Sequence, residues 1–128
     1  MGQKGGLMKV YNNIINGKEV GSKTGRRFEN RNPANWEEVI GTFPRSNHDD
    51  VNEAVASARK AYEMWRLVPP PKRAEILRKA TEIMIERKED LARLMTEEMG
   101  KILKETKGDV QEGIDTGLYA SGEGRRLF

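Results

Sequence analysis

Two turn signals within residues 10–46, and helical periodicity in everything that follows, limit this chain to an α+β arrangement. Asn16 and Gly17 both tolerate positive φ and lie between short apolar stretches, which is a strong local signal for a β-hairpin. A second pair of strands is expected on either side of an Asn-Pro turn at residues 32–35. We therefore expect β-hairpins in a short meander over residues 10–46, after a loose glycine-rich tail at residues 1–9.

Residues 47–128 are expected to form about four helices. Asn47 is a good N-cap for the first of them, and Asp50 can reach back to close a capping box. Three consecutive prolines then interrupt the chain and favour the first turn of a second helix. A third, shorter helix is expected to end at Met99, with Gly100 as its left-handed C′ residue.

Apolar residues recur at helical spacing in these segments and are expected to face a core. Trp65 is interpreted as an anchoring core aromatic rather than as a platform for a ligand. The residues expected to face inward are Val51, Ala54, Val55, Ala58, Tyr62 and Trp65, then Ala74, Leu77, Ala80, Ile83 and Met84, then Leu91, Leu94 and Met95.

The last expected helix, at about residues 106–126, is rich in glycine. It contains five glycines, and each costs up to about 1 kcal/mol relative to alanine in a helix interior. Gly113 and Gly117 are four residues apart, so they share a face on which another backbone could approach closely. We expect that either a large partner surface holds this helix or the helix frays.

Charge and composition exclude several classes of partner. The 128 residues carry a net charge of +3 and 34% charged side chains, and the two signs alternate along the helices. Such interleaving is typical of solvated helix faces rather than of a nucleic-acid surface. No apolar run approaches the roughly 20 residues that span a bilayer. We expect a cytoplasmic protein with neither nucleic acid nor a membrane as its partner.

The sequence contains no cysteine and a single histidine, which excludes disulfides, thiolate metal sites and a histidine-based zinc site. Gly122-Glu123-Gly124 lies inside an expected helix rather than between a strand and a helix, so it is no dinucleotide-binding fingerprint. We assign no catalytic residue and no cofactor-binding residue to this chain.

Several short pieces, taken in order and with their spacing, carry a resemblance to a known family. They are Ile15-Asn16-Gly17-Lys18, Arg31-Asn32-Pro33-Ala34, Asp50-Val51, Trp65-Arg66, Arg73-Ala74-Glu75-Ile76-Leu77 and Glu98-Met99-Gly100-Lys101. From about Tyr11 onward, the chain resembles the start of the aldehyde dehydrogenase superfamily. The resemblance implies the beginning of that family's α/β fold, including a partial shell of its cofactor domain.

The resemblance also implies an enzyme that oxidises an aldehyde to a carboxylic acid with NAD or NADP. The family uses a cysteine thiolate as nucleophile and a glutamate as general base, in segments that follow the region matched here. We therefore expect the 128-residue chain to be inactive by itself and to bind no cofactor alone. Its expected partners are the remainder of an aldehyde dehydrogenase chain and, in the whole enzyme, further copies in a homo-oligomer.

Two sites are carried over residue by residue from the family. The backbone oxygen of Arg31 and the carboxylate of Glu98 match ligands of a monovalent-cation site, although Glu98 could equally be a surface carboxylate that pairs with a lysine or arginine. Lys107 and Gln111, with Glu112 beside them, match positions that line the substrate tunnel. A charged helix turn facing solvent would give the same pattern.

The run at residues 108–112 resembles the branch of the family that oxidises aminoadipate semialdehyde, and its polar side chains disfavour a purely aliphatic tunnel. We therefore predict a small or polar aldehyde as substrate. The alternative function is an autonomous helical protein-interaction module from a truncated gene, whose glycine-rich helix binds a partner. Nucleic-acid binding would rest only on the pI of about 9.2.

Overall fold

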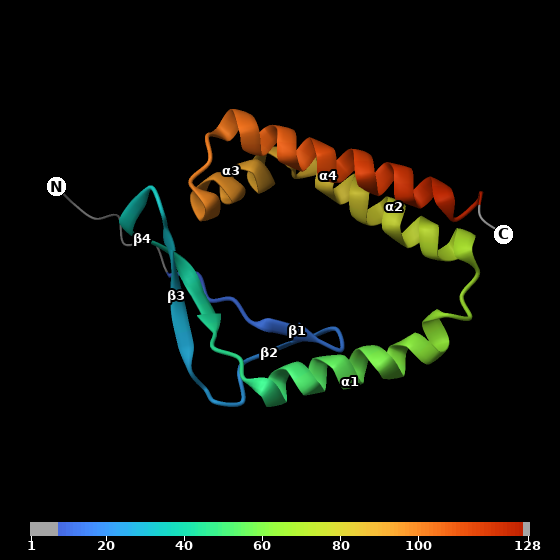
Figure 1. The fold of residues 1–128 in the computed structure, drawn as a ribbon, viewed down its shortest axis with the longest axis horizontal. Helices are drawn as coiled ribbons and strands as arrows, with labels where there is room; N and C mark the ends of the chain where they lie inside the picture. The colour runs from blue at the N-terminus through green and yellow to red at the C-terminus, as the bar shows by residue number, and fades with distance from the viewer. Residues whose placement is uncertain (1–7, 127–128) are drawn as a thin grey trace. The chain divides into compact units, whose positions relative to one another are not determined.

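The computed structural model describes residues 8–126 and divides into two compact units, residues 1–62 and 63–128, which we describe separately. The strands are β1 (Asn13–Ile15), β2 (Lys18–Val20), β3 (Arg27–Asn32) and β4 (Asn35–Pro44) (Figure 1). The helices are α1 (His48–Trp65), α2 (Pro70–Glu86), α3 (Lys88–Met99) and α4 (Leu103–Glu123). The expected α+β class, with short strands followed by four helices, is confirmed.

The first hairpin forms where the sequence places it. β1 and β2 pair antiparallel, with Ile15 opposite Lys18. Asn16 and Gly17 connect them with φ values of 53° and 70°. Two consecutive positive φ angles are what a tight two-residue hairpin turn requires, and asparagine and glycine adopt them at least cost.

The second hairpin pairs β3 with β4, also antiparallel, and places Phe28 opposite Phe43. The Tyr11 ring stacks on Phe43 with ring centroids 4.7 Å apart, because the backbone at residues 9–11 adds to the free edge of β4. Gly41 makes this addition possible, since a β-carbon there would lie 2.7 Å from the Tyr11 ring.

Helix α1 begins with the predicted capping box. The Asn47 side-chain oxygen accepts hydrogen bonds from the backbone N–H groups of Asp49 and Asp50, at 3.0 and 3.1 Å. The Asp50 carboxylate in turn accepts the backbone N–H of Asn47 at 2.8 Å. These bonds satisfy donors that the first turn of a helix leaves without partners.

The predicted core face of α1 is wrong. Val51 and Val55 are 56% and 47% exposed, and Tyr62 is 58% exposed. Trp65, expected as a core anchor, is 41% exposed. These side chains share one stripe of the helix, but of the residues expected to face inward on α1 only Ala54 is even partly buried. Periodicity identifies a face and does not say what covers it.

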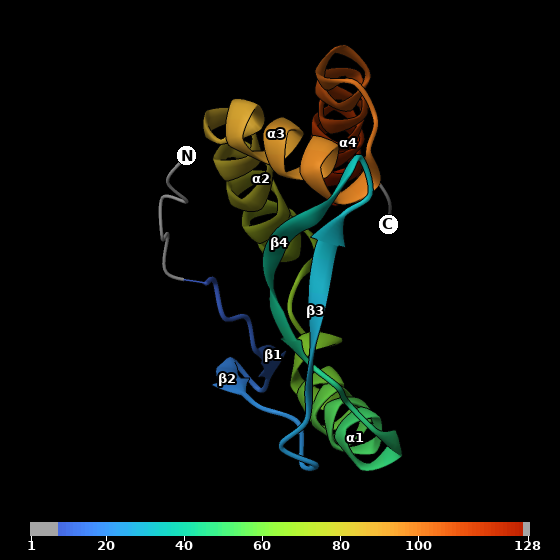
Figure 2. The same cartoon turned by 90° about the vertical axis from the view of Figure 1, so that its left-hand side faces the viewer.

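In the second unit α4 packs against both α2 and α3, and Figures 1 and 2 show α2 and α4 side by side. The proline run opens α2, and α3 ends at Gly100, whose φ of 72° is the predicted left-handed cap. The core contains Ala92, Val110 and Ile114, with Met84, Leu91, Met95 and Leu103 packed against it.

Helix α4 starts at Leu103, three residues earlier than expected, because Leu103 itself joins this core. Gly113 and Gly117, the pair expected to allow close approach of another backbone, face α2, and so does Gly124. A β-carbon on Gly117 would lie 2.4 Å from Thr81 Oγ1, and one on Gly124 would lie 2.6 Å from Ala74 Cβ. The surface that holds this helix is therefore supplied by α2 and α3 of the same chain.

Because α4 approaches α2 so closely, the inward face of α2 differs from the one we expected. Ala74 is buried and Met84 is partly buried, but Leu77 and Ile83 are 40% and 53% exposed, and Ala80 is exposed as well. Thr81, which an apolar pattern passes over, is 1% exposed. Where the backbones are closest, only small side chains fit, so α2 presents Ala74 and Thr81 to α4 there, and Met84 lies against Gly113.

Candidate functional site

Lys107 and Gln111 lie one turn apart on α4, and the start of α3 lies beside them. Lys107 Nζ forms an ion pair with Glu89 Oε2 at 2.8 Å. Gln111 accepts a hydrogen bond from Lys88 Nζ at 2.6 Å and donates one to Asp115 at 2.8 Å. The structure thus brings two of the three predicted tunnel residues into one polar row.

The charges in this row affect each other. The hydrogen bond from Lys107 holds the pKa of Glu89 below its usual value, and the nearby positive charges of Lys107 and Arg93 act in the same direction. Lys107 and Glu89 are 40% and 59% exposed at their side chains, so solvent screens this attraction. A ligand with a negative or hydrogen-bonding group could bind this row in two ways. It could displace Glu89 from Lys107, or it could bind Lys107 alongside Glu89.

Glu112, the third predicted tunnel residue, is exposed, and within residues 8–126 it forms no ion pair and no side-chain hydrogen bond. It lies on the turn that contains Gln111 but outside the polar row. The tunnel assignment of all three residues remains a prediction.

The predicted cation ligands lie in different units. Arg31 is on β3, where irregular pairing interrupts the ladder on both sides of it, and its guanidinium donates to the Trp36 carbonyl at 2.9 Å. Glu98 is on α3. Within the described residues no group of three or more histidine, cysteine, aspartate or glutamate side chains could hold a metal ion. The cation site, too, remains a prediction.

An apolar cleft of about 430 Å³ lies beside Glu98 in the second unit. Its walls are leucine and methionine side chains of α3 together with parts of α2 and α4, and Glu98 and Asp109 provide its acidic groups. Asp109 pairs with Lys101 and raises the pKa of that lysine through a hydrogen bond. The sequence signal for this cleft was the apolar spacing of α3, which we interpreted only as a core face.

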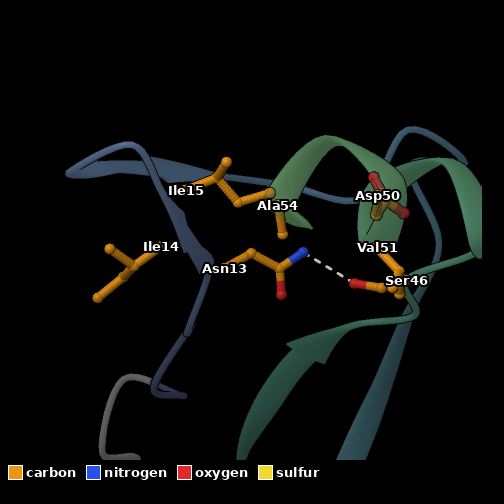
Figure 3. Close-up of a pocket in the computed structure, with 7 residues that line it drawn as sticks. All are labelled: Asn13, Ile14, Ile15, Ser46, Asp50, Val51 and Ala54. Carbon is orange, nitrogen blue, oxygen red and sulfur yellow. Dashed lines mark hydrogen bonds between the residues drawn. The ribbon is translucent and has the colours of Figure 1, made fainter. Parts of the chain in front are cut away.

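A smaller hollow of about 230 Å³ lies in the first unit, between β1 and the start of α1 (Figure 3). Asn13 donates a hydrogen bond to Ser46 Oγ at 2.8 Å across it. Asp50 is 4% exposed and accepts hydrogen bonds from Asn47, Lys23 and Ser22. Because its oxygens are already occupied, this carboxylate has a structural role here rather than a ligand-binding one.

A model of the aldehyde dehydrogenase family matches residues 20–128. The chain belongs to the aldehyde dehydrogenase family. The malonate-semialdehyde dehydrogenase of Lacticaseibacillus casei is 42% identical over 116 residues, which are 90% of this chain and 23% of that protein. An alpha-ketoglutarate semialdehyde dehydrogenase of Haloferax volcanii is 40% identical over 115 residues, again 90% of this chain, and 24% of that protein.

The crystal structure of an NAD-dependent aldehyde dehydrogenase from Sinorhizobium meliloti superposes with a TM-score of 0.89 and 31% sequence identity. The superposition covers 94% of this chain and 24% of that one. This aldehyde dehydrogenase chain therefore spans about a quarter of the length of the relatives that it matches.

The glycine pair Gly122 and Gly124 of this aldehyde dehydrogenase chain lacks the surroundings of a dinucleotide-binding loop. Gly122 is within α4, and Gly124 closes that helix with φ −61° and ψ −13°. A phosphate-binding glycine loop lies between a strand and a helix N-terminus, and this glycine pair lies at a helix C-terminus. The sequence also lacks the cysteine on which thiolate chemistry depends.

None of the helices within residues 8–126 combines the length and apolar character needed to cross a bilayer.

Proposed function

We propose that this chain is part of an NAD- or NADP-dependent aldehyde dehydrogenase that oxidises a small semialdehyde, an aldehyde bearing a second, negatively charged group, to a carboxylic acid. The observation that carries the proposal is the 42% identity, over 90% of this chain, to a malonate-semialdehyde dehydrogenase. The prediction of a small or polar aldehyde, made from residues 108–112, agrees with it.

Lys107 and Gln111 are the residues of this chain that we propose to face the substrate. A lysine that pairs with the Glu89 carboxylate at 2.8 Å has the chemistry to pair with the carboxylate of a semialdehyde instead. Gln111 offers both a donor and an acceptor next to it on the helix. Their role would be to bind the end of the substrate that is farther from the reacting carbon and so to position the substrate.

The reaction itself needs groups that this chain does not contain. We propose that the nucleophile, the general base and the cofactor site belong to further parts of the enzyme, and that the 128-residue chain alone has no dehydrogenase activity. We propose a cytoplasmic homo-oligomer as the working form of the whole enzyme, and Arg31 and Glu98 as ligands of its monovalent cation.

The test uses the whole enzyme, purified with the complete reading frame that contains this chain. Initial rates with malonate semialdehyde are compared with those for propanal and nonanal. We expect the highest kcat/KM with the semialdehyde. Best turnover with nonanal would contradict the proposal.

A matched pair of variants then tests the residue assignment. Lys107→Gln should raise KM for the semialdehyde by roughly tenfold or more, the effect of losing a charge-assisted hydrogen bond, with little change for propanal. Lys104 is an exposed position on the same helix, and Lys104→Gln should change the KM of neither substrate. Equal effects on both substrates would show that Lys107 does not contact the carboxylate.

A further inference from the structure

A recess of about 360 Å³ lies in the second unit, where the end of α4 meets the start of α2. Its walls include Trp65, Pro70, Arg73, Leu77, Ala120 and Gly124. At Gly124 the backbone of α4 lies very close to the start of α2, because a β-carbon there would be 2.8 Å from the Pro70 carbonyl oxygen. The two helices therefore meet too closely at this end for their own side chains to fill the space above.

The walls of this recess, which we call the Arg73 recess, are partly apolar and accessible. Trp65 and Leu77 are 41% and 40% exposed, and both belong to residues 63–128. An indole and an isobutyl side chain that remain in contact with water at the mouth of a hollow provide apolar area for a partner to cover.

Arg73 is the charged group of the recess, and it lacks a partner among residues 8–126. Its Nε is buried and donates to no acceptor in that range. Its guanidinium also forms none of the ion pairs found there. Glu75, two residues further along the chain, pairs with Lys72 and Arg125, and Glu123, next to Gly124, pairs with Arg126. A buried donor on a charged group is costly unless an acceptor reaches it.

We propose that the Arg73 recess binds a peptide segment that carries an aspartate or glutamate next to an apolar residue. The planar fork of the guanidinium matches a carboxylate, which can accept two parallel hydrogen bonds. Lys72 and Arg125, which adjoin the lining residues Arg73 and Gly124 in sequence, share the single carboxylate of Glu75. Positive charge therefore exceeds negative charge there even before Arg73 is counted, which further favours an acidic ligand.

The apolar walls explain why the ligand is a segment of protein rather than a free anion. A carboxylate alone would neutralise Arg73 and leave Trp65 and Leu77 uncovered. An apolar residue beside the acid covers them and excludes water from the ion pair, which strengthens it.

The experiment uses Trp65 as the reporter in a Trp36→Phe background, since these are the two tryptophans of the chain and Trp36 is 72% exposed on β4. The fluorescence is titrated with N-acetyl-Phe-Glu-Leu-amide and with the isosteric glutamine peptide. We expect the glutamate peptide to bind roughly tenfold more tightly or better. Equal affinities, or no fluorescence change with either peptide at millimolar concentration, would overturn the proposal.

Three variants and one small anion complete the test. Arg73→Gln should abolish the preference for glutamate, and Arg73→Lys, which keeps the charge but not the fork, should reduce it. Arg78→Gln, on the same helix and paired with Glu82, should preserve it. A preference retained in Arg73→Gln would overturn the proposal, as would sodium isobutyrate binding as tightly as the glutamate peptide, because the recess would then be a site for small anions. Far-UV circular dichroism establishes that each variant is folded.

Discussion

Gly117 lies against Thr81 so closely that a β-carbon on the glycine would be 2.4 Å from the threonine Oγ1. The Thr81 hydroxyl donates to the Leu77 carbonyl of its own helix at 3.0 Å, so it is satisfied without a partner on α4. The threonine side chain is in this way held flat against α2. A glycine opposite it brings the two helix backbones together at this point while the buried Thr81 hydroxyl keeps its hydrogen bond.

Gly117→Ala is expected to destabilise the second unit by about 1–3 kcal/mol, because overpacking a tight interface forces side chains or backbone to shift. Three atoms of Thr81 lie within 3.3 Å of the added carbon, and they belong to a short side chain that cannot swing away. Urea unfolding followed by far-UV circular dichroism measures the change.

The control is Gly108→Ala on the same helix. No atom lies within 4 Å of a β-carbon at Gly108, so this variant gains helix propensity without a clash and should be up to about 1 kcal/mol more stable. If both variants shift stability in the same direction, the contact with Thr81 is not what requires glycine at position 117.

Asp50→Asn is expected to lower the melting temperature of the first unit at neutral pH. The backbone N–H groups of Asn47 and Lys23 and the Ser22 hydroxyl lower the pKa of the Asp50 carboxyl by hydrogen bonding to its charged form. A carboxyl whose pKa is lower in the folded state stabilises the fold above its unfolded pKa, about 4, and loses that effect as the pH falls through the folded value.

The difference in melting temperature between wild type and Asp50→Asn should therefore become smaller as the pH falls below about 4. Thermal melting, followed through the amide signals of β3 and β4, provides the measurement. A difference in melting temperature that stays constant down to low pH would show that the ionised carboxylate is not the stabilising form.

Lys107→Gln is expected to raise the pKa of Glu89 toward its ordinary value. The hydrogen bond from Lys107 is the largest cause of the lowered pKa, and glutamine supplies no charge in its place. Titration of the Glu89 carboxyl by carbon NMR reads this directly, and Lys104→Gln serves as the variant that should leave it unchanged. An unaltered Glu89 titration in Lys107→Gln would rule out the ion pair in solution.

Gly41→Ala is expected to release the backbone at residues 9–11 from β4. A β-carbon at position 41 would lie 2.7 Å from the Tyr11 ring and 3.0 Å from the Lys9 carbonyl oxygen. The amide of Tyr11, which donates to the Thr42 carbonyl at 2.9 Å, should then exchange with solvent faster. Gly21→Ala, at a site with nothing within 4 Å, is the control that should leave this exchange rate unaltered.

Sequence reasoning predicted the features that depend on a few adjacent residues. The turn at Asn16, the cap at Asn47 and the helix end at Gly100 each follow from local backbone preference. The buried faces were predicted less well, because a stripe of apolar residues does not specify which other element covers it. Val55 is exposed for that reason, and Thr81 is buried because a glycine faces it.

The candidate sites show the same contrast between features set by nearby residues and features set by contacts between segments. Lys107 and Gln111 fall on one helix face by spacing alone, so their polar row could be predicted, whereas the acid that pairs with Lys107 could not. The Arg73 recess gave no signal in the sequence. Its walls come from three segments of the chain, at residues 65, 70–77 and 120–124, and no spacing along one segment reveals that they meet.

Asp50 binds groups that all precede it along the chain, at Ser22, Lys23 and Asn47. During synthesis on the ribosome, the loop and the strand end that it joins emerge before the carboxylate does. The link that the Asp50 carboxylate makes between residues 22–23 and Asn47 therefore forms only after the opening turn of α1 has left the exit tunnel, later than the bonds by which Tyr11 and Thr42 join residues 9–11 to β4.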